Sequence, residues 1–197
     1  MKRIHLLLTL FVSSTLFLSC DKEGTDTKFG IFEVLPDEQT VEMDGTISSS
    51  TLEDFNELEA AFPDVKTINI VNCDGSSDDE INLQVSAKVH QKGMNTHILD
   101  NGDIASGGVD FFLAGIQRTK GENTRIGVHS WAGGGNEATD FPVGDSEHQP
   151  YIDYYISVGF TQQEAEDFYY FTINAAPAAE IHWMTEAEIM QYGMITQ

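Results

Sequence analysis

The sequence predicts one α/β domain with a mainly parallel sheet flanked by helices. Short β-branched segments such as Thr67–Val71 are typical of strands that are buried on both faces. Segments with apolar residues at helical spacing alternate with these strands along the chain. Turns rich in Gly, Asn and Asp separate the two kinds of segment, and this alternation favours parallel pairing.

The elements expected in the first half of the domain are two extended segments, a helix, a strand and a second helix, at residues 29–35, 40–47, 50–62, 67–71 and 79–92. The stretch from Ser50 to Glu53 has the pattern of a capping box, which predicts where the first helix begins. Asp79 and Glu80 suit the N-terminus of the second helix because its dipole favours negative charge there.

The elements expected in the second half are a strand, a buried helix, another strand and three helices, at residues 96–99, 109–114, 125–129, 150–158, 162–174 and 185–192. A turn is expected at Asp100–Asp103, directly after the first of these strands. Thr185 and Glu188 form a capping-box pattern for the last helix. Residues 131–149 lack periodicity and are expected to form a long loop.

The first 19 residues have the pattern of a signal peptide. Lys2 and Arg3 precede an apolar run, Leu6–Leu18, which is too short to span a bilayer. The run ends in Ser19-Cys20, which resembles the lipobox of bacterial lipoproteins. The resemblance implies a signal peptide at 1–19, lipid on Cys20, a tether over 20–28 and a domain over 29–197. The protein is then expected in the cell envelope, held to a membrane by its lipid and either periplasmic or surface-exposed. An ordinary signal peptide cut nearby is the alternative.

The charge of the chain bears on its partners. Against 10 Lys and Arg there are 32 Asp and Glu, which gives a formal net charge of −22. Such acidity argues against nucleic acid or an anionic membrane face as a partner. If Cys20 carries lipid, Cys73 is the only other cysteine and no internal disulfide can form. Because Cys73 follows a predicted strand, a buried structural thiol is expected.

Two turns and one strand carry the clearest signal for function. Gly102–Gly108 followed by the apolar stretch Val109–Gly115 resembles the nucleophile segment of the proteolytic subunit of Clp protease. Asn123–His129 resembles the strand that ends in the catalytic histidine of that family, and Asn69–Gly75 resembles the strand and turn that supply an oxyanion donor. With the closing segment Trp183–Ile195, the resemblance covers about residues 41–195. It implies a ClpP/crotonase-like fold of repeated β-β-α units, and no cofactor.

The resemblance implies a serine hydrolase site. Ser106 corresponds to the nucleophile and His129 to the base, because a serine hydroxyl needs an adjacent base to take its proton. The unperturbed pKa of a histidine, about 6.5, suits that role. The backbone N–H of Gly107 and that of Gly75 or Ser76 are expected to form the oxyanion hole.

The third member of the triad departs from the family pattern. The aspartate of the family is expected two residues before an aromatic residue, here Trp183, and that position holds Ile181. Glu180 is the first candidate to orient His129, and Asp140 in the long loop is the second. A third interpretation is that no acid exists and that a backbone carbonyl or water orients the ring.

Two functions of different classes follow. The first is a Ser/His hydrolase, peptidase-like, acting on a peptide or acyl substrate; the second is a catalytically inactive ClpP-like binding module on the same fold. Crotonase chemistry on an acyl thioester is a third hypothesis. The expected location outside the cytoplasm disfavours it, because it disfavours coenzyme A substrates. The resemblance also implies a homo-oligomer, because residues 131–149 fall where the family inserts a subunit-contact handle.

Several other residues are expected to be structural. His148 and His182 are expected to be structural or surface residues, and the aromatic residues of 151–155 and 168–171 to pack in the core or against another subunit. No His, Cys and Asp spacing predicts a metal site. The acidic turn Asp74–Glu80 lacks the spacing of an EF-hand and is expected to be solvated.

Overall fold

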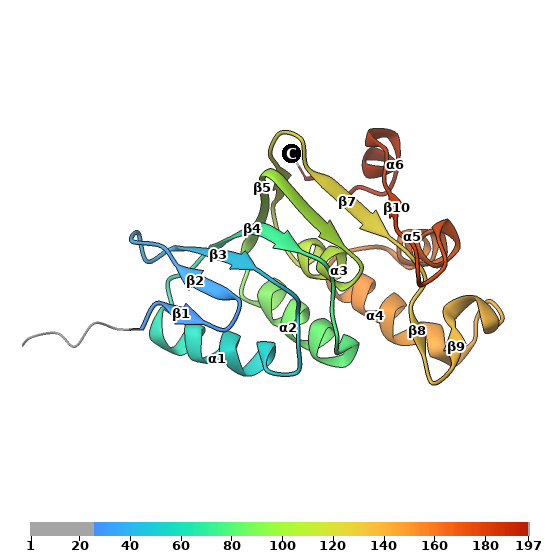
Figure 1. Ribbon diagram of the computed structural model, residues 1–197, viewed down its shortest axis with the longest axis horizontal. Helices are drawn as coiled ribbons and strands as arrows, with labels where there is room; N and C mark the ends of the chain where they lie inside the picture. Colours follow the sequence, from blue (N-terminus) through green and yellow to red (C-terminus); the bar gives the residue numbers. More distant parts are fainter. Residues whose placement is uncertain (1–25, 197) are drawn as a thin grey trace, which may run out of the picture.

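The computed structural model describes residues 26–196, so the predicted signal peptide, Cys20 and most of the predicted tether lie outside the described residues. The strands are β1 (Lys28–Phe29), β2 (Phe32–Val34), β3 (Thr40–Asp44), β4 (Thr67–Cys73), β5 (Asn95–Ala105), β6 (Arg118–Lys120), β7 (Arg125–Val128), β8 (Ala132–Gly133), β9 (Asn136–Glu137) and β10 (His182–Trp183). One sheet has the order β1-β2-β3-β4-β5-β7-β10, with β6 beside β5 (Figure 1). Its central strands β3, β4, β5 and β7 are parallel, whereas β1, β2 and β10 are antiparallel to their neighbours at the two edges. The predicted fold class is thereby confirmed.

The helices flank this sheet, as expected. They are α1 (Thr51–Ala61), α2 (Asp79–Gln91), α3 (Gly107–Leu113), α4 (Gln149–Ser157), α5 (Gln162–Ala175) and α6 (Glu186–Gln191), with short 3-10 turns η1 (Ala138–Asp140) and η2 (Ser146–His148). Helices α1, α2 and α4 lie side by side along one face of the sheet (Figure 1). Within residues 26–196 no helix combines the length and the apolar character needed to cross a membrane.

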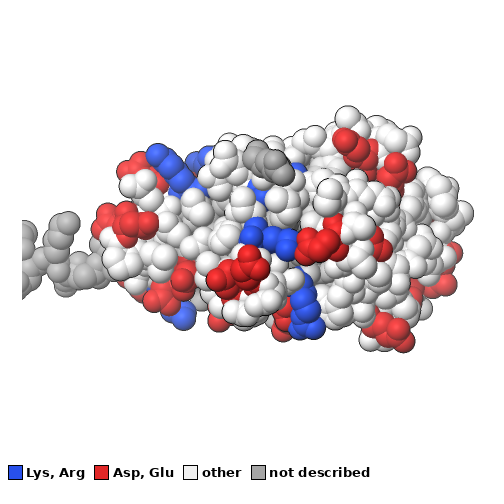
Figure 2. Space-filling view, turned by 90° about the horizontal axis from the view of Figure 1, so that it is seen from above, with Lys and Arg blue, Asp and Glu red and all other residues white. Residues whose placement is uncertain are grey.

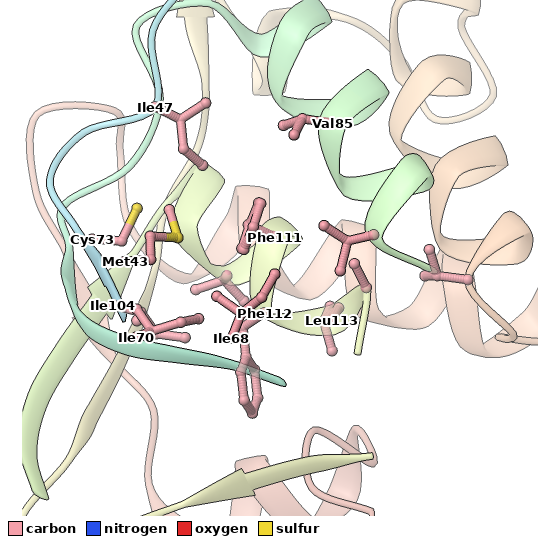
Figure 3. Close-up of a cluster of buried hydrophobic side chains, with 14 of the residues drawn as sticks. Met43, Ile47, Ile68, Ile70, Cys73, Val85, Ile104, Phe111, Phe112 and Leu113 are labelled. Carbon is pink, nitrogen blue, oxygen red and sulfur yellow. The ribbon is translucent and has the colours of Figure 1, made fainter. Parts of the chain in front are cut away.

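The core lies between the sheet and these helices (Figure 3). Ile68 and Ile70 of β4 and Phe111 and Phe112 of α3 are fully buried in it. Burial of each such side chain stabilises the fold by about 1.5–3 kcal/mol. Cys73 is also fully buried in this cluster, and burial raises the pKa of its thiol to about 11. The expectation of a buried structural thiol is confirmed.

Strand β5 differs from the sequence prediction. A turn was expected at Asp100–Asp103, but β5 continues through these residues to Ala105. The predicted turn is instead an irregularity in the pairing with β4: Ile70 lies opposite Ile98, and Asn72 lies opposite Asp103. The strand therefore bulges at this point without ending, and its second half pairs with β7.

Two helix starts distinguish a real capping box from an apparent one. At α1 the predicted capping box is wrong, because Ser50 is itself helical and its side chain caps no backbone N–H. Ser50 Oγ donates to Asp54 Oδ2 at 3.0 Å instead. At α6 the predicted capping box is confirmed. Thr185 Oγ1 accepts from the N–H of Glu188, and the Glu188 carboxylate accepts from the N–H of Thr185.

Hairpins occur in two segments where none was expected. One segment was predicted to be a single strand and the other a long loop. Residues 29–35 do not form one strand, because Gly30 at φ +56° turns the chain between β1 and β2. The predicted long loop 131–149 contains the β8–β9 hairpin, whose two-residue turn is Gly134-Gly135. Both glycines have positive φ, which is the conformation that such a tight hairpin turn requires.

Candidate active site

The ends of two neighbouring parallel strands bring Ser106 and His129 together. Ser106 directly follows β5 and His129 directly follows β7, and Ala105 lies opposite Gly127 in the parallel pairing of these strands. The N–H of Ser106 donates to the carbonyl of Gly127 at 3.0 Å. Both residues line one cavity of about 40 Å³, although no direct hydrogen bond joins them within the described residues. Such bonds commonly tighten only when substrate binds.

Ser106 has a strained backbone at the entry to a buried helix. Its φ is +51° and its ψ is −130°, a region that residues other than glycine rarely adopt and that costs about 1–3 kcal/mol. The bond to Gly127 and a bond from the N–H of Val109 to the Ser106 carbonyl, at 2.8 Å, hold this geometry. A sharp strand-to-helix turn of this kind is how hydrolases present a nucleophile.

Glycines let two chain segments meet at Ser106. A Cβ on Gly75, where φ is +136°, would lie 2.9 Å from Ser106 Cβ. A Cβ on Gly107 would lie 2.5 Å from Ser76 Oγ, and one on Gly108 would lie 2.7 Å from the carbonyl of Cys73. The turn after β4 therefore packs directly on the N-terminus of α3 only because these positions lack side chains.

The predicted oxyanion donors lie at this junction. Within residues 26–196, no acceptor bonds the backbone N–H of Gly75, Ser76 or Gly107. The N–H of Gly107 is the first of α3 and so belongs to the end of the helix that carries a partial positive charge. Free N–H groups close to a serine hydroxyl can stabilise a developing oxyanion, as the chemistry of acyl transfer requires.

Aromatic side chains form the wall of the cavity. Trp131 stacks on Tyr151 with ring centroids 6.3 Å apart, and Tyr151 stacks on Tyr169 at 5.7 Å. Trp131 Nε1 donates to the Tyr169 hydroxyl at 2.9 Å, and that hydroxyl lies 2.8 Å from His148 Nδ1. His148 is buried in this wall, so its structural role is confirmed. The tyrosines were expected to pack in the core, and the structure adds that they also border the candidate site.

Asp110 is a site residue that the sequence reasoning missed. It lines the cavity from α3, one turn after Ser106, and accepts a bond from the Tyr155 hydroxyl at 2.6 Å. Asn82 Nδ2 lies 3.4 Å from its other carboxylate oxygen. Burial raises the pKa of Asp110 to about 7, in spite of the bond from Tyr155. The available signal was a single carboxylate inside the otherwise apolar run Val109–Leu113.

Within residues 26–196, no carboxylate bonds Nδ1 of His129. Nδ1 of this ring is buried and has no hydrogen-bond partner among the described residues. Glu180, the first candidate, is exposed and closes a turn in which its N–H donates to the Pro177 carbonyl at 3.0 Å. Asp140, the second candidate, accepts from the N–H of Glu137 at 2.8 Å at the start of η1. Neither expected contact to the imidazole is present: the carboxylate of Asp140 bonds the N–H of Glu137, and the side chain of Glu180 is exposed.

The remaining polar residues have structural roles. His182 Nε2 lies 3.1 Å from the carboxylate of Glu188, beside the cap of α6. Asp78 caps α2 and accepts from Ser49 Oγ at 2.6 Å, so part of the acidic turn is held by hydrogen bonds. No group of three or more His, Cys, Asp or Glu in the part of the chain that the structure describes could hold a metal ion.

Comparison with known proteins identifies the fold. No protein-family model and no curated protein sequence matches the chain. Among solved structures, ClpP1 from Listeria monocytogenes is 20% identical with a TM-score of 0.54, over 81% of this chain and 89% of that chain. A mutant of the 1510-N membrane-bound stomatin-specific protease, in complex with a substrate peptide, is 20% identical with a TM-score of 0.50, over 78% of this chain and 71% of that chain. The chain therefore has a ClpP-like fold.

Proposed function

We propose that the protein is a Ser/His hydrolase of the peptidase type. The single observation that supports this most is Ser106, held at positive φ at the start of α3 in the cavity that His129 also lines. In this proposal His129 takes the proton of the Ser106 hydroxyl, and the oxygen attacks a substrate carbonyl. The N–H groups of Gly107 and of Gly75 or Ser76 stabilise the resulting oxyanion.

A peptide is the proposed substrate class. Among the structural neighbours, the stomatin-specific protease has a substrate peptide in its complex, which supports the same class here. The cavity of about 40 Å³ beside Ser106 has room for a few waters or a small side chain. A small or polar residue next to the scissile bond fits this volume better than a large apolar one.

A catalytically inactive binding module is the second candidate. The observation that favours it is His129 Nδ1, which is buried without a partner. Loss of the orienting acid alone can lower the rate of a triad hydrolase by about four orders of magnitude. Such an enzyme would be slow, and binding could be the only function left to the site.

Labelling with a fluorophosphonate decides between these two functions. The hydrolase proposal expects the probe to label the protein at Ser106, and Ser106→Ala to abolish the labelling. Ser77→Ala, which changes an exposed serine near the same turn, is the control and is expected to leave labelling unchanged. Absence of labelling in the folded wild type, or its persistence in Ser106→Ala, would refute the hydrolase proposal.

The proposed location is the cell envelope, through lipid on Cys20. The lipobox-like end of the apolar leader supports it. We also propose a homo-oligomer, in which residues 131–149, with the exposed β8–β9 hairpin, contribute to the subunit contact. Light scattering of the purified domain tests the oligomer, and a monomer at all concentrations would refute it.

A further inference from the structure

A groove over α2 and α4 lies next to the candidate active site. It has a volume of about 620 Å³ and shares Asp79, Trp131 and Tyr151 with the cavity that Ser106 and His129 line. Helices α2 and α4 lie side by side and contact each other (Figure 1). The groove therefore borders the cavity that contains Ser106, and it is large enough to hold several side chains.

The floor of the groove is apolar. Leu83 and Ala87 of α2 and Pro150 and Tyr151 at the start of α4 line it. Trp131 stacks on Tyr151 where the groove meets the cavity. Apolar and aromatic surfaces of this kind bind the methylene stems of long side chains, and aromatic faces attract cations.

The rim of the groove is acidic. Its charged residues all carry carboxylates, and they are Asp79, Glu80, Glu147 and Asp153. All four are exposed, and none of them takes part in a salt bridge within the described residues. The cations in and directly after α2 point elsewhere, since Lys88 and Lys92 both pair with Glu59 of α1. The negative charge at the rim is therefore not neutralised by any salt bridge within residues 26–196.

The charge of another face differs from that of the groove. The face seen in Figure 2 carries Lys and Arg side chains interspersed with Asp and Glu. No Lys or Arg lines the groove in the part of the chain that the structure describes. The acidic character of the groove is therefore a local feature and does not simply follow from the net charge of −22.

We propose that this groove binds a basic segment of a peptide, with Lys or Arg stems on the apolar floor and their charged heads at the carboxylates of the rim. The groove presents apolar contact for the stems and complementary charge for the heads, which together select for such a segment. An acidic or polyanionic ligand is repelled by the same rim. The role of this segment as part of a substrate depends on the proposed function; its binding does not.

Trp131 provides a direct readout of groove occupancy. The chain contains two tryptophans, and Trp183 lies on β10 against Arg125. In a Trp183→Phe protein, Trp131 is the only tryptophan and its emission reports on the junction of groove and cavity. Adding Ser106→Ala prevents turnover. The probe is a capped lysine–leucine peptide, compared with the same peptide carrying glutamine or glutamate in place of every lysine.

Two matched sets of substitutions complete the experiment. Glu80→Gln, Glu147→Gln and Asp153→Asn together remove three charges from the rim of the groove. Glu53→Gln, Glu57→Gln and Asp64→Asn remove three exposed charges in and after α1, on the other side of α2. Both sets change the net charge equally, so they separate local recognition from general attraction.

The expected result is saturable quenching or enhancement of Trp131 emission by the lysine peptide alone. The rim set is expected to weaken this binding about tenfold, because three surface ion pairs of ordinary strength add to that factor. The α1 set is expected to leave the affinity unchanged. Equal binding of the glutamine peptide, or equal weakening by both sets, would overturn the proposal. Fluorophosphonate labelling of Ser106 is scored separately, so failure of the hydrolase proposal and failure of the groove proposal are distinguishable.

Discussion

Gly75 lies directly against Ser106: a Cβ built on Gly75 would approach Ser106 Cβ to 2.9 Å and its Oγ to 3.4 Å. The contact joins the turn after β4 to the start of α3, two segments that are 31 positions apart in the chain (106 − 75). It makes the position of the hydroxyl depend on the absence of a side chain at residue 75. The φ of +136° at Gly75 adds a second reason for glycine there.

Replacing Gly75 by alanine is therefore expected to displace Ser106. We expect the rate of fluorophosphonate labelling to fall at least about tenfold, and the free energy of unfolding to fall by about 1–3 kcal/mol from backbone strain. Urea unfolding and labelling kinetics measure the two effects. Gly133→Ala is the control, because a Cβ there would meet no atom within 4 Å. Wild-type labelling kinetics in folded Gly75→Ala would contradict the packing argument.

A substitution can give His129 the carboxylate partner that its Nδ1 atom lacks. Strand β10 pairs antiparallel with β7, with His182 opposite Val128, so continuing this register places residue 181 opposite His129. Ile181→Asp is expected to give His129 Nδ1 a partner and to raise the labelling rate at least about tenfold, a small part of what an orienting acid contributes. Labelling kinetics as a function of pH measure the effect.

The control for that substitution is Ile116→Asp, which places the same charge at another half-exposed isoleucine. It is expected to leave labelling unchanged. If the two variants behave alike, the unpartnered nitrogen does not limit the reaction.

The buried carboxyl of Asp110 makes stability depend on pH. Burial raises its pKa to about 7, above the value of about 3.9 expected in the unfolded chain. The folded state thus binds the proton more tightly, and its stability falls as pH rises from about 4 through about 7. Three pKa units correspond to about 4 kcal/mol, which is an upper bound for this group.

Asp110→Asn removes this titration. The difference in the free energy of unfolding between pH 5 and pH 8 is expected to shrink by up to about 2.7 kcal/mol relative to the wild type, because about two of the three pKa units are titrated in this interval. Urea unfolding at the two pH values measures it, and Asp64→Asn, an exposed aspartate, serves as the control. An unchanged difference in Asp110→Asn would show that Asp110 is ionised in the folded protein at both pH values.

Lipidation is tested by metabolic labelling. In a bacterial host fed an alkyne fatty acid, the wild-type protein is expected to take up label and to sediment with membranes. Cys20→Ala is expected to lose both properties, whereas Cys73→Ala keeps them because Cys73 is fully buried in the core. Label on the Cys20→Ala protein would contradict the lipobox interpretation.

The sequence predicted the parallel sheet and the helices well, because the β-branched strands and the apolar helix faces are local patterns. Predictions from the sequence were wrong where strand pairing between distant segments overrides the local composition. Asp100–Asp103 has the composition of a turn, yet β4 and β7 hold these residues within β5. Ser50 has the right neighbours for a cap, but the side chain of Thr51 accepts from the N–H of Ser48 and the helix starts differently.

In the candidate site, too, local patterns predicted some residues and failed for others. Ser106 and His129 could be predicted because each follows a strand at a recognisable turn. The orienting acid could not, because whether Glu180 or Asp140 reaches a ring depends on turns that bond locally. The role of Asp110 could not be predicted for a further reason. Its environment is formed by Tyr155 of α4 and Asn82 of α2, which are distant in the chain.

The bulge in β5 also restricts how this chain can vary in length. The four residues Leu99–Gly102 lie between the two registers of β5 with β4, and they fix which residue of β5 meets Gly127. A single inserted or deleted residue there would slip the second half of the strand and turn Ser106 to the opposite face. Relatives that keep the serine are therefore expected to conserve the spacing from Ile98 to Ser106, whereas the exposed β8–β9 hairpin is free to lengthen or shorten.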